Sequence, residues 1–269
     1  MEDDAKPLLQ WCDTHCHLDA MELQSDFDSM MARSLAAGVT RWIVPAVALS
    51  GFEQVLDLSE RFEGLWFALG IHPLYVQSAK PNHVDVLEQW ITRHRANQQL
   101  FAVGEIGLDL YPGHPPFEVQ LAFFDAQLRL AKRYDLPVIV HARRAADQVF
   151  AALRRFQIRK GIVHAFNGSE QQAHALISQG MMLGFGGSLS FEGSKRIRRL
   201  AQTLPLKSML LETDAPDIRP SWFGADSHRP NEPAELANIA ACLSKLRGVS
   251  EVELSTVFAA NLERLKRSL

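Results

Sequence analysis

The sequence predicts an α/β fold in which eight parallel strands close into a barrel, and three observations lead to this prediction. Short apolar runs rich in β-branched residues alternate with longer amphipathic stretches, which is typical of parallel strands joined by crossover helices. The strand runs are continuously apolar, as expected for a sheet buried on both faces. The chain has 269 residues, close to the roughly 250 residues that eight such units need. We therefore predict a (β/α)8 TIM barrel that forms a single domain over residues 1–269.

The predicted elements follow one another without a linker or a low-complexity run. The strands are expected, in chain order, at 10–15, 41–47, 65–70, 101–106, 136–141, 161–166, 181–186 and 208–214. Helical patterns separate them at 25–37, 50–62, 83–95, 117–134, 145–157, 169–178 and 193–203, and two more follow at 232–247 and 251–266. Gly38 is a stop signal for the first helix, and the fourth begins after two prolines, Pro115 and Pro116.

Two segments are expected to lie outside these elements. Residues 1–9 are predicted to form a flexible N-terminal extension. The longest stretch without a helical pattern, 215–231, follows the last strand and would therefore lie over the carboxyl-terminal face of the barrel. Long loops in compact domains are usually functional.

Composition and charge exclude several classes of protein. The 28 Lys and Arg residues and 31 Asp and Glu residues give a net charge of −3, so the chain does not coat nucleic acid by bulk positive charge. The 47% hydrophobic content supplies a large core and excludes a disordered protein. Three cysteines cannot build a disulfide framework, which favours the reducing cytoplasm. No apolar run is long enough for a membrane span, and the N-terminal MEDDAKPLLQ lacks the signal-peptide pattern.

Histidines and carboxylates gather at the ends of the predicted strands. Barrel active sites lie at the carboxyl ends of the strands, so these residues are expected to meet in one place. Five of the ten histidines in the chain are among them. The set comprises His15, His17, His72, Glu105, His141, His164 and Asp214.

Residue type and spacing in this set point to metal binding. His15 and His17 are two apart, so on a strand both would face the barrel mouth and share one divalent ion. His141, His164 and Glu105 would hold a second ion or bridge two, and Asp214 would ligate metal and accept a proton from metal-bound water. For any one of His72, His141 or His164 alone, a structural role is as good an interpretation as a ligand role.

Other polar residues near the strand ends have two interpretations each. Glu212 would support a ligand or be a buried structural carboxylate, and Asp109 would orient a histidine through its second nitrogen or cap a loop. Arg143 and Arg144 would bind a phosphate at the rim of the site or belong to an exposed helix start. His72 would contact substrate.

The remaining candidates are assigned to packing or to solvent. Cys12 and Cys16 are read as packing residues, whereas His228, in the long loop, stays open as a substrate contact. Four histidines are expected to be solvated: His83, His94, His114 and His174. The basic runs are read mainly as solvated faces of outer helices: Arg154-Arg155, Arg159-Lys160, Lys195-Arg196 and Arg198-Arg199.

Six blocks of the sequence, in order, resemble the signature blocks of TatD-type metal-dependent deoxyribonucleases. They are DTHCHLD (13–19), GIHP (70–73), GEIGLD (104–109), QLRLAKRYDLPVIVHARRA (127–145), HAFNGS (164–169) and LETDAP (211–216). The resemblance implies an amidohydrolase-like TIM barrel with two divalent metals. It implies that His15 and His17 bind one ion, that Glu105 bridges, that His141 and His164 complete the coordination shell of the second ion, and that Asp214 binds metal near the attacking water.

The chain departs from the family pattern at two places. Many members have an arginine just before the NEP block, whereas Pro230 stands here between Arg229 and Asn231. Many also have Asn-Ala or Asn-Thr near the C-terminus, where this chain has Asn261-Leu262. Both differences bear on subgroup and substrate, not on the predicted metal site.

The resulting hypothesis is a divalent-metal-dependent hydrolase that cleaves phosphodiester bonds of single-stranded DNA at an end. Arg143 would hold a phosphate, and Glu105, Asp214 and His72 would act in catalysis. Mg2+ or Mn2+ is expected in activity, whereas the histidine-rich ligands also suit Zn2+, Co2+ or Ni2+. No obligate protein partner is implied.

Two alternatives remain open at this stage. The first is a hydrolase of a small amide, ester or lactone on the same barrel, because the sequence has no aromatic-interleaved basic groove. The second is a barrel that binds metal or a partner without catalysis. The position of Asp214 argues against the second, because a purely structural site does not need a base beside an open coordination position.

Overall fold

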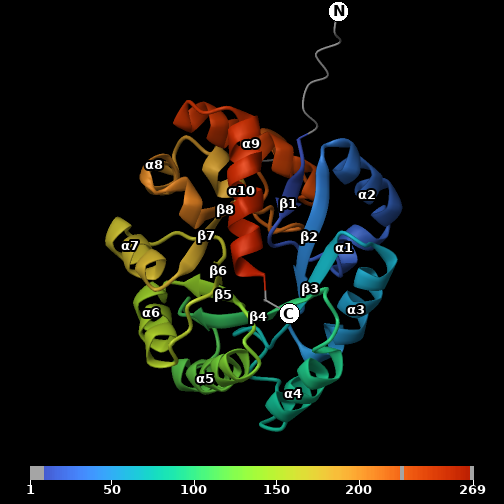
Figure 1. Ribbon diagram of the computed structural model, residues 1–269, viewed down its shortest axis with the longest axis vertical. Helices are drawn as coiled ribbons and strands as arrows, with labels where there is room; N and C mark the ends of the chain where they lie inside the picture. The colour runs from blue at the N-terminus through green and yellow to red at the C-terminus, as the bar shows by residue number, and fades with distance from the viewer. Residues whose placement is uncertain (1–8, 225–226, 267–269) are drawn as a thin grey trace, which may run out of the picture.

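In the computed structural model, which describes residues 9–224 and 227–266, eight parallel strands follow one another around a barrel (Figure 1). Of the expected extension 1–9, residues 1–8 lie outside the described residues. The strands are β1 (Trp11–Asp13), β2 (Val39–Pro45), β3 (Leu65–Leu69), β4 (Leu100–Asp109), β5 (Val138–Arg143), β6 (Gly161–Val163), β7 (Met181–Phe185) and β8 (Met209–Leu211). The predicted (β/α)8 architecture is confirmed.

The barrel closes between β8 and β1 through contacts just beyond the strands. The backbone N–H and the hydroxyl of Thr14 donate to the Leu211 carbonyl, at 3.2 and 2.9 Å. The buried carboxylate of Asp13 accepts from the backbone N–H of Thr213 at 2.9 Å and from its hydroxyl at 2.5 Å. These bonds fix the start of the chain against the last strand, next to two of the strand ends where chemistry is expected.

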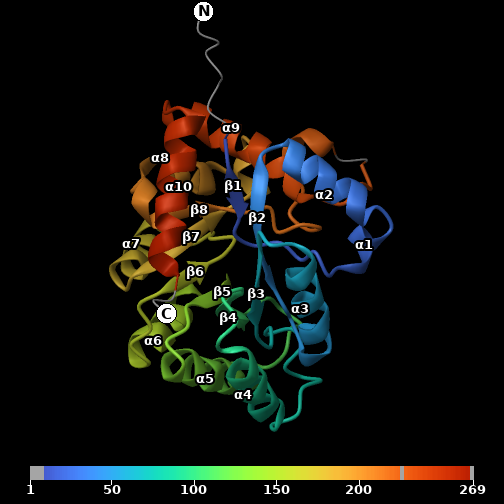
Figure 2. The ribbon, with the colours of Figure 1, turned by 45° about the vertical axis from the view of Figure 1, so that its right-hand side comes forward.

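Ten helices of the described residues surround the barrel (Figures 1 and 2). They are α1 (Met21–Gln24), α2 (Phe27–Ala36), α3 (Phe52–Arg61), α4 (His83–His94), α5 (Phe117–Arg133), α6 (Ala146–Arg155), α7 (Glu170–Ser178), α8 (Lys195–Thr203), α9 (Leu236–Arg247) and α10 (Glu251–Leu265). Single 3-10 turns occur at Leu49–Gly51, Gly187–Ser190, Leu206–Ser208, Ser221–Phe223 and Pro233–Glu235.

The helix expected over 25–37 is present as α2 (Phe27–Ala36), and a short helix that was not expected, α1, precedes it. Ser25 and Asp26 separate the two helices. Short polar side chains of this kind compete with the helical backbone and favour helix ends over helix interiors. Asp26 instead forms an ion pair with Arg33 at 2.7 Å on the next helix.

The core fills both the barrel and the layer between barrel and helices. All ten residues of β4 are buried, as continuous burial on both faces of a parallel sheet requires. The largest fully buried side chains include Phe67 and Phe185 on strands and Phe52 and Phe124 on helices. Within the described part of the chain, no helix has the length and hydropathy needed to cross a bilayer.

The two ends of the barrel differ. Helix α10 lies across the amino-terminal end, in front of β8 and β1 in Figure 1. There the Asn261 side-chain N–H groups donate to the carbonyls of Leu206 and Met209, both at 2.8 Å, and the Ser255 hydroxyl donates to the Gln10 carbonyl at 2.8 Å. The opposite end, where the strands point, opens into a cavity of about 1440 Å³.

Candidate metal centre

The two histidines after β1 lie in a loop, because the regular strand ends at Asp13. The strand alternation does not continue through this loop, because the backbone N–H groups of Thr14 and Cys16, two residues apart, donate to opposite neighbours, Leu211 of β8 and Ile43 of β2. The side chains of His15 and His17 nevertheless converge, and their Nε2 atoms are 3.2 Å apart.

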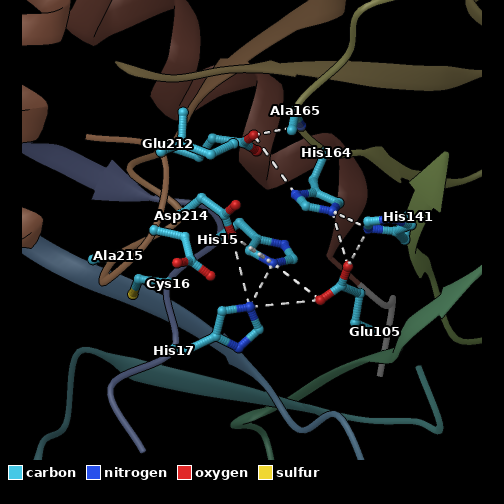
Figure 3. Close-up of polar contacts among 12 residues, drawn as sticks. His15, Cys16, His17, Glu105, His141, His164, Ala165, Glu212, Asp214 and Ala215 are labelled. Carbon is cyan, nitrogen blue, oxygen red and sulfur yellow. Dashed lines mark hydrogen bonds and ion pairs between the residues drawn. The ribbon is translucent and has the colours of Figure 1, made fainter. Parts of the chain in front are cut away.

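A first set of ligand atoms, here called donor set A, consists of His15 Nε2, His17 Nε2, Glu105 Oε2 and Asp214 Oδ1 (Figure 3). His15 Nε2 lies 3.3 Å from the glutamate oxygen and 3.4 Å from the aspartate oxygen, and His17 Nε2 lies 3.6 Å from each. Tetrahedral ligands at about 2.1 Å from an ion are about 3.4 Å apart. The spacing of donor set A is that of a metal coordination shell.

Donor set B consists of Glu105 Oε1, His141 Nδ1 and His164 Nε2. The glutamate oxygen lies 3.1 Å from the His141 nitrogen and 2.8 Å from the His164 nitrogen, which are themselves 3.2 Å apart. Glu105 therefore presents one oxygen to each set (Figure 3). The sequence predicts Glu105 at the end of its strand, but β4 continues to Asp109, so Glu105 lies in the middle. Its side chain is only 2% exposed.

Asp109 makes both of the contacts that the sequence left as alternatives. One oxygen, Oδ2, lies 3.0 Å from His141 Nε2, and the other, Oδ1, accepts the backbone N–H of Tyr111 at 3.0 Å. The carboxylate accepts a hydrogen bond from Nε2–H, so the lone pair of the neutral His141 ring lies on Nδ1. That lone pair faces donor set B.

These contacts show that a cation fits the site. The lone pair on His141 Nδ1 faces a carboxylate oxygen and a second imidazole nitrogen at close range, and unshared lone pairs repel one another unless a proton or a metal ion lies between them. The donor atoms, imidazole nitrogen and carboxylate oxygen, are those that divalent transition metals and Zn2+ prefer. The residues present therefore fit the metal ions that the sequence predicts.

The contacts of His72 identify it as a hydrogen-bond donor. Its Nδ1 accepts the backbone N–H of Leu74 at 3.2 Å, so the neutral ring carries its proton on Nε2. Nε2 lies 3.3 Å from Glu105 Oε1, so this edge of the ring faces the floor of the site. His72 thus stands beside donor set B with an N–H and not a lone pair directed at the site.

Burial and mutual contacts shift the titration of the site. Burial alone would raise the pKa of Glu105, but the surrounding imidazoles of His72, His164 and His15 outweigh it and hold this pKa well below its usual value. Burial lowers the pKa of His15, which keeps this ring neutral and its lone pair free. Burial raises the pKa of Asp214.

Glu212 lies behind donor set B and is buried. Its Oε1 accepts the backbone N–H of Ala165 at 2.5 Å and lies 3.9 Å from His164 Nδ1. Burial raises its pKa to about 8. The contact with Ala165 gives Glu212 a structural role in the loop after β6, and its position behind His164 is that of a supporting residue.

Left-handed backbone conformations are concentrated at the site. Within the part of the chain that the structure describes, six non-glycine residues have positive φ, and two of them directly follow the last turns of α5 and α6, where this conformation is common. The other four all line the cavity: Arg144, Ala165, Asp214 and Ile218. Strained residues of this kind persist where the surrounding structure holds them, and active sites are a common place for them.

Two residues that the sequence placed in solvent belong to the site region. His114 Nδ1 lies 2.9 Å from Asp109 Oδ1, because the loop after β4 folds back over the strand end, so the prediction of a solvated side chain is wrong. Arg196 lines the cavity, although its helix was read as a solvated face. No local sequence pattern marks either contact. His174 is exposed as expected, and His228 in the long loop is exposed as well.

The predicted substrate contacts lie along the rim and the wall of the cavity. Arg143, half-exposed, and Arg144 both lie at its rim with their guanidinium carbons 4.2 and 4.9 Å from the ring centre of Tyr111. The start of the 215–231 segment lines the cavity with Pro216, Asp217 and Ile218, so this loop reaches the carboxyl-terminal face as expected.

An eight-stranded parallel barrel with imidazole and carboxylate donors at its carboxyl end is the architecture of metal-dependent hydrolases. The sequence profile described as TatD related DNase matches residues 12–267, which is nearly the whole chain. The chain belongs to the TatD family.

Individual relatives agree with this assignment. The chain is 39% identical over 255 residues to the uncharacterized metal-dependent hydrolase YjjV of Escherichia coli, with 94% of this chain and 96% of that protein covered. The crystal structure of this TatD homologue superimposes with a TM-score of 0.91 at 38% identity and covers 98% of this chain and 100% of the other. A Danio rerio relative, 31% identical over 261 residues with 94% and 96% covered, carries a provisional deoxyribonuclease name.

Proposed function

We propose that this protein hydrolyses phosphodiester bonds of single-stranded DNA, starting from an end, with the help of two divalent metal ions. The observation that carries the proposal is Glu105, whose two oxygens face two separate sets of ligand atoms at the floor of one open cavity. Two-metal sites of this kind are used for phosphoryl transfer. The family membership and the deoxyribonuclease name of the Danio rerio relative support the same substrate class.

The residues have distinct roles in this proposal. His15, His17 and Asp214 would hold one ion, His141 and His164 would hold the other, and the carboxylate of Glu105 would be shared between them. Mg2+ or Mn2+ would serve in activity, and Zn2+, Co2+ or Ni2+ would also fit the nitrogen-rich donors. Bound divalent ions would lower the pKa of the attacking water and stabilise the charge of the reacting phosphate.

The protein's own side chains then account for proton movement and substrate position. The carboxylate of Asp214 takes the proton of the water whose oxygen attacks phosphorus. The Nε2–H of His72 is directed at the same floor and donates to an oxygen of the reacting phosphate or to the oxygen that leaves as the P–O bond breaks. Arg143 offers two parallel N–H groups to a phosphate at the rim.

The size of the cavity favours DNA over a small amide, ester or lactone. Sites for small molecules are typically about 300–1,000 Å³. The cavity here is larger, about 1440 Å³, and it is open at the end of the barrel. A strand with unpaired bases enters such a mouth, whereas a duplex would have to be read along its grooves.

The experiment is hydrolysis of a labelled single-stranded oligonucleotide by metal-stripped protein to which Mg2+, Mn2+, Co2+ or Zn2+ is returned. Cleavage is expected only after a metal is restored, with a product ladder that reports the end and the polarity of the attack. His141→Ala purified in parallel controls for a contaminating nuclease and should be inactive.

Small ester, lactone and amide substrates are assayed in the same series. If protein shown to hold metal cleaves a small acyl substrate and leaves every oligonucleotide intact, the nuclease proposal is wrong. If the metal-loaded protein acts on neither class, the non-catalytic alternative stands. Arg143→Ala should raise KM for the oligonucleotide and change kcat little, because the residue contacts the substrate at the rim.

A further inference from the structure

The charged residues around the cavity are not evenly distributed. All three Lys or Arg side chains among its described lining residues lie at the end of β5 or follow β5 or β7: Arg143, Arg144 and Arg196. The acidic side chains away from the floor follow β8 or β1: Asp19, Glu22 and Asp217. Because the strands lie in chain order around the barrel, the mouth has a basic arc over β5–β7 and an acidic arc over β8–β1.

Arg196 is held in place without being neutralised. It lies in the first turn of α8, where its Nε–H and one terminal N–H both donate to Asn167 Oδ1, at 3.2 and 2.7 Å. Among the described residues no carboxylate lies within ion-pair distance of it. By contrast, Arg199 on the same helix pairs with Glu170 at 3.5 Å. Arg196 therefore retains its full charge and free N–H groups at the cavity wall.

The opposite end of the basic arc is also ordered. The ring of Tyr111 contacts both guanidinium groups that follow β5, and Arg143 is in addition 4.0 Å from Asp109. Such cation–π contacts stabilise a guanidinium at a fixed position and leave its edges free for hydrogen bonds. Between the two ends lies the segment after β6, which carries Asn167 and donor-set residue His164.

We propose that Arg196 is a substrate-binding residue that holds a phosphate of the DNA strand beyond the one being cleaved. The strand then leaves the metal centre over β6 and β7, from Arg143 and Arg144 toward α8, and is kept away from β8 and β1 by Asp19, Glu22 and Asp217. Flanking phosphates carry full negative charge, so they favour the basic arc and are repelled by the acidic one. This inference rests on the proposed nuclease function and adds the path of the substrate.

The test compares Arg196→Ala with Arg199→Ala on two substrates. The first is a single-stranded oligonucleotide, and the second is bis-p-nitrophenyl phosphate, a phosphodiester without flanking phosphates. Arg196→Ala should raise KM for the oligonucleotide about fivefold, in line with the loss of one charged hydrogen bond at an exposed position. It should leave kinetics on the short diester and the metal content unchanged. Arg199→Ala removes the same charge from the same helix and should change neither KM.

Salt dependence supplies an independent readout of phosphate contact. The slope of log Kd against log salt for the oligonucleotide should fall by about 0.7 in Arg196→Ala, the value for one phosphate contact on a single strand. Arg196→Lys, which keeps the charge, should keep the slope. Binding is measured by fluorescence anisotropy in Ca2+, without turnover.

The outcomes separate this inference from the proposed function. If the parent protein cleaves both substrates and Arg196→Ala matches it in KM and in salt slope, the assignment of Arg196 is wrong while the nuclease remains. If Arg196→Ala raises KM equally for both substrates, the residue acts on the reacting phosphate or on the fold, and the proposed path is wrong. If the parent cleaves neither, the nuclease proposal itself fails.

Discussion

The orientation of single side chains determines which atoms face the two donor sets. Asp109 fixes the proton of His141 on Nε2, and the Leu74 backbone N–H fixes the proton of His72 on Nε2 as well by donating to its Nδ1. The two rings differ in the nitrogen that faces the site, which is Nδ1 in His141 and Nε2 in His72. Two histidines beside the same carboxylate, Glu105, therefore offer different chemistry: one presents a lone pair and the other an N–H. Partners of this kind commonly control metal affinity as strongly as the ligands themselves.

Asp109→Asn tests this dependence. The amide removes the negative charge that stabilises the Nε2 proton of His141, so we expect metal affinity to fall about 10- to 100-fold. Metal content is measured after dialysis against graded chelator. Asp125→Asn, which removes a surface ion pair with Arg155 on the outer helices, is the control and should retain normal affinity. Equal metal retention in the two variants would contradict the role of Asp109.

Glu105→Ala tests the shared carboxylate. Removing both oxygens takes one ligand from donor set A and one from donor set B, so we expect both metal ions to be lost and cleavage to disappear. His17→Ala is the matched comparison, because its ring contributes to donor set A alone. Metal analysis of the purified proteins gives the answer, and full metal content with full activity in Glu105→Ala would exclude the bridging assignment.

At the scale of elements, the sequence predicted the number, order and type of the barrel strands and less well where each one ends. Strands β6 and β8 have only three residues each, because regular pairing stops where the chain turns toward the site. His164 and Asp214 therefore lie beyond their strands, whereas Glu105 and His141 lie within theirs. The approximate position of each strand end was nevertheless enough to identify the ligand candidates as one group.

The sequence did not predict which loop and helix residues contact the site. His114 and Arg196 reach the site region from segments whose local pattern indicates only a loop and an amphipathic helix. The basic arc likewise joins residues from separate strand ends and helices, so no run of basic and aromatic letters reveals it. Such features depend on which turns fold over which strand, and hydrophobic periodicity carries no information about that.

An ion cluster attaches the turn Pro233–Glu235 to α2. The buried carboxylate of Glu232 accepts from Arg33 at 2.7 Å and from Arg229 at 2.6 Å, so the arginine before the NEP block makes this contact despite the inserted Pro230. The side chains of Arg33 and Arg229 are 45% and 52% exposed, so they stay partly hydrated when their partner is removed.

Glu232→Ala should therefore lower the free energy of unfolding by about 1–3 kcal/mol, well below the cost of two fully buried unpaired charges. Urea unfolding followed by circular dichroism measures it. Glu263→Ala, which breaks an exposed pair with Arg41, should cost less than about 1 kcal/mol. A smaller effect for Glu232→Ala than for this control would show that the cluster does not anchor the turn.

At the scale of the whole molecule, the barrel separates stability from chemistry. Helix α10 closes the amino-terminal end, and the donor sets occupy the carboxyl-terminal end. In barrels of this kind, residues at the carboxyl-terminal face serve function and residues at the amino-terminal face serve stability. A defect at the closed end is therefore expected to change the stability and to leave the metal centre intact.

Asn261→Ala tests this separation. The substitution leaves the part-buried carbonyl of Leu206 and the buried carbonyl of Met209 without their donor, which should cost about 2–4 kcal/mol. For a chain of this size the melting temperature should fall by roughly 5–15 °C. Metal content at 25 °C should equal that of the parent. Loss of metal in a variant that remains folded at that temperature would contradict the separation.

The shared carboxylate would also make the two proposed ion sites electrically unequal. Donor set A contains the whole charge of Asp214 and a share of Glu105, whereas donor set B has only the remaining share and neutral rings. A dication in donor set B is thus the less compensated of the two and should be released first. Chelator titration should show two successive losses, with Asp214→Asn bringing them together. The protein would then pass through a half-loaded state, in which supply of the second ion decides whether a water is activated.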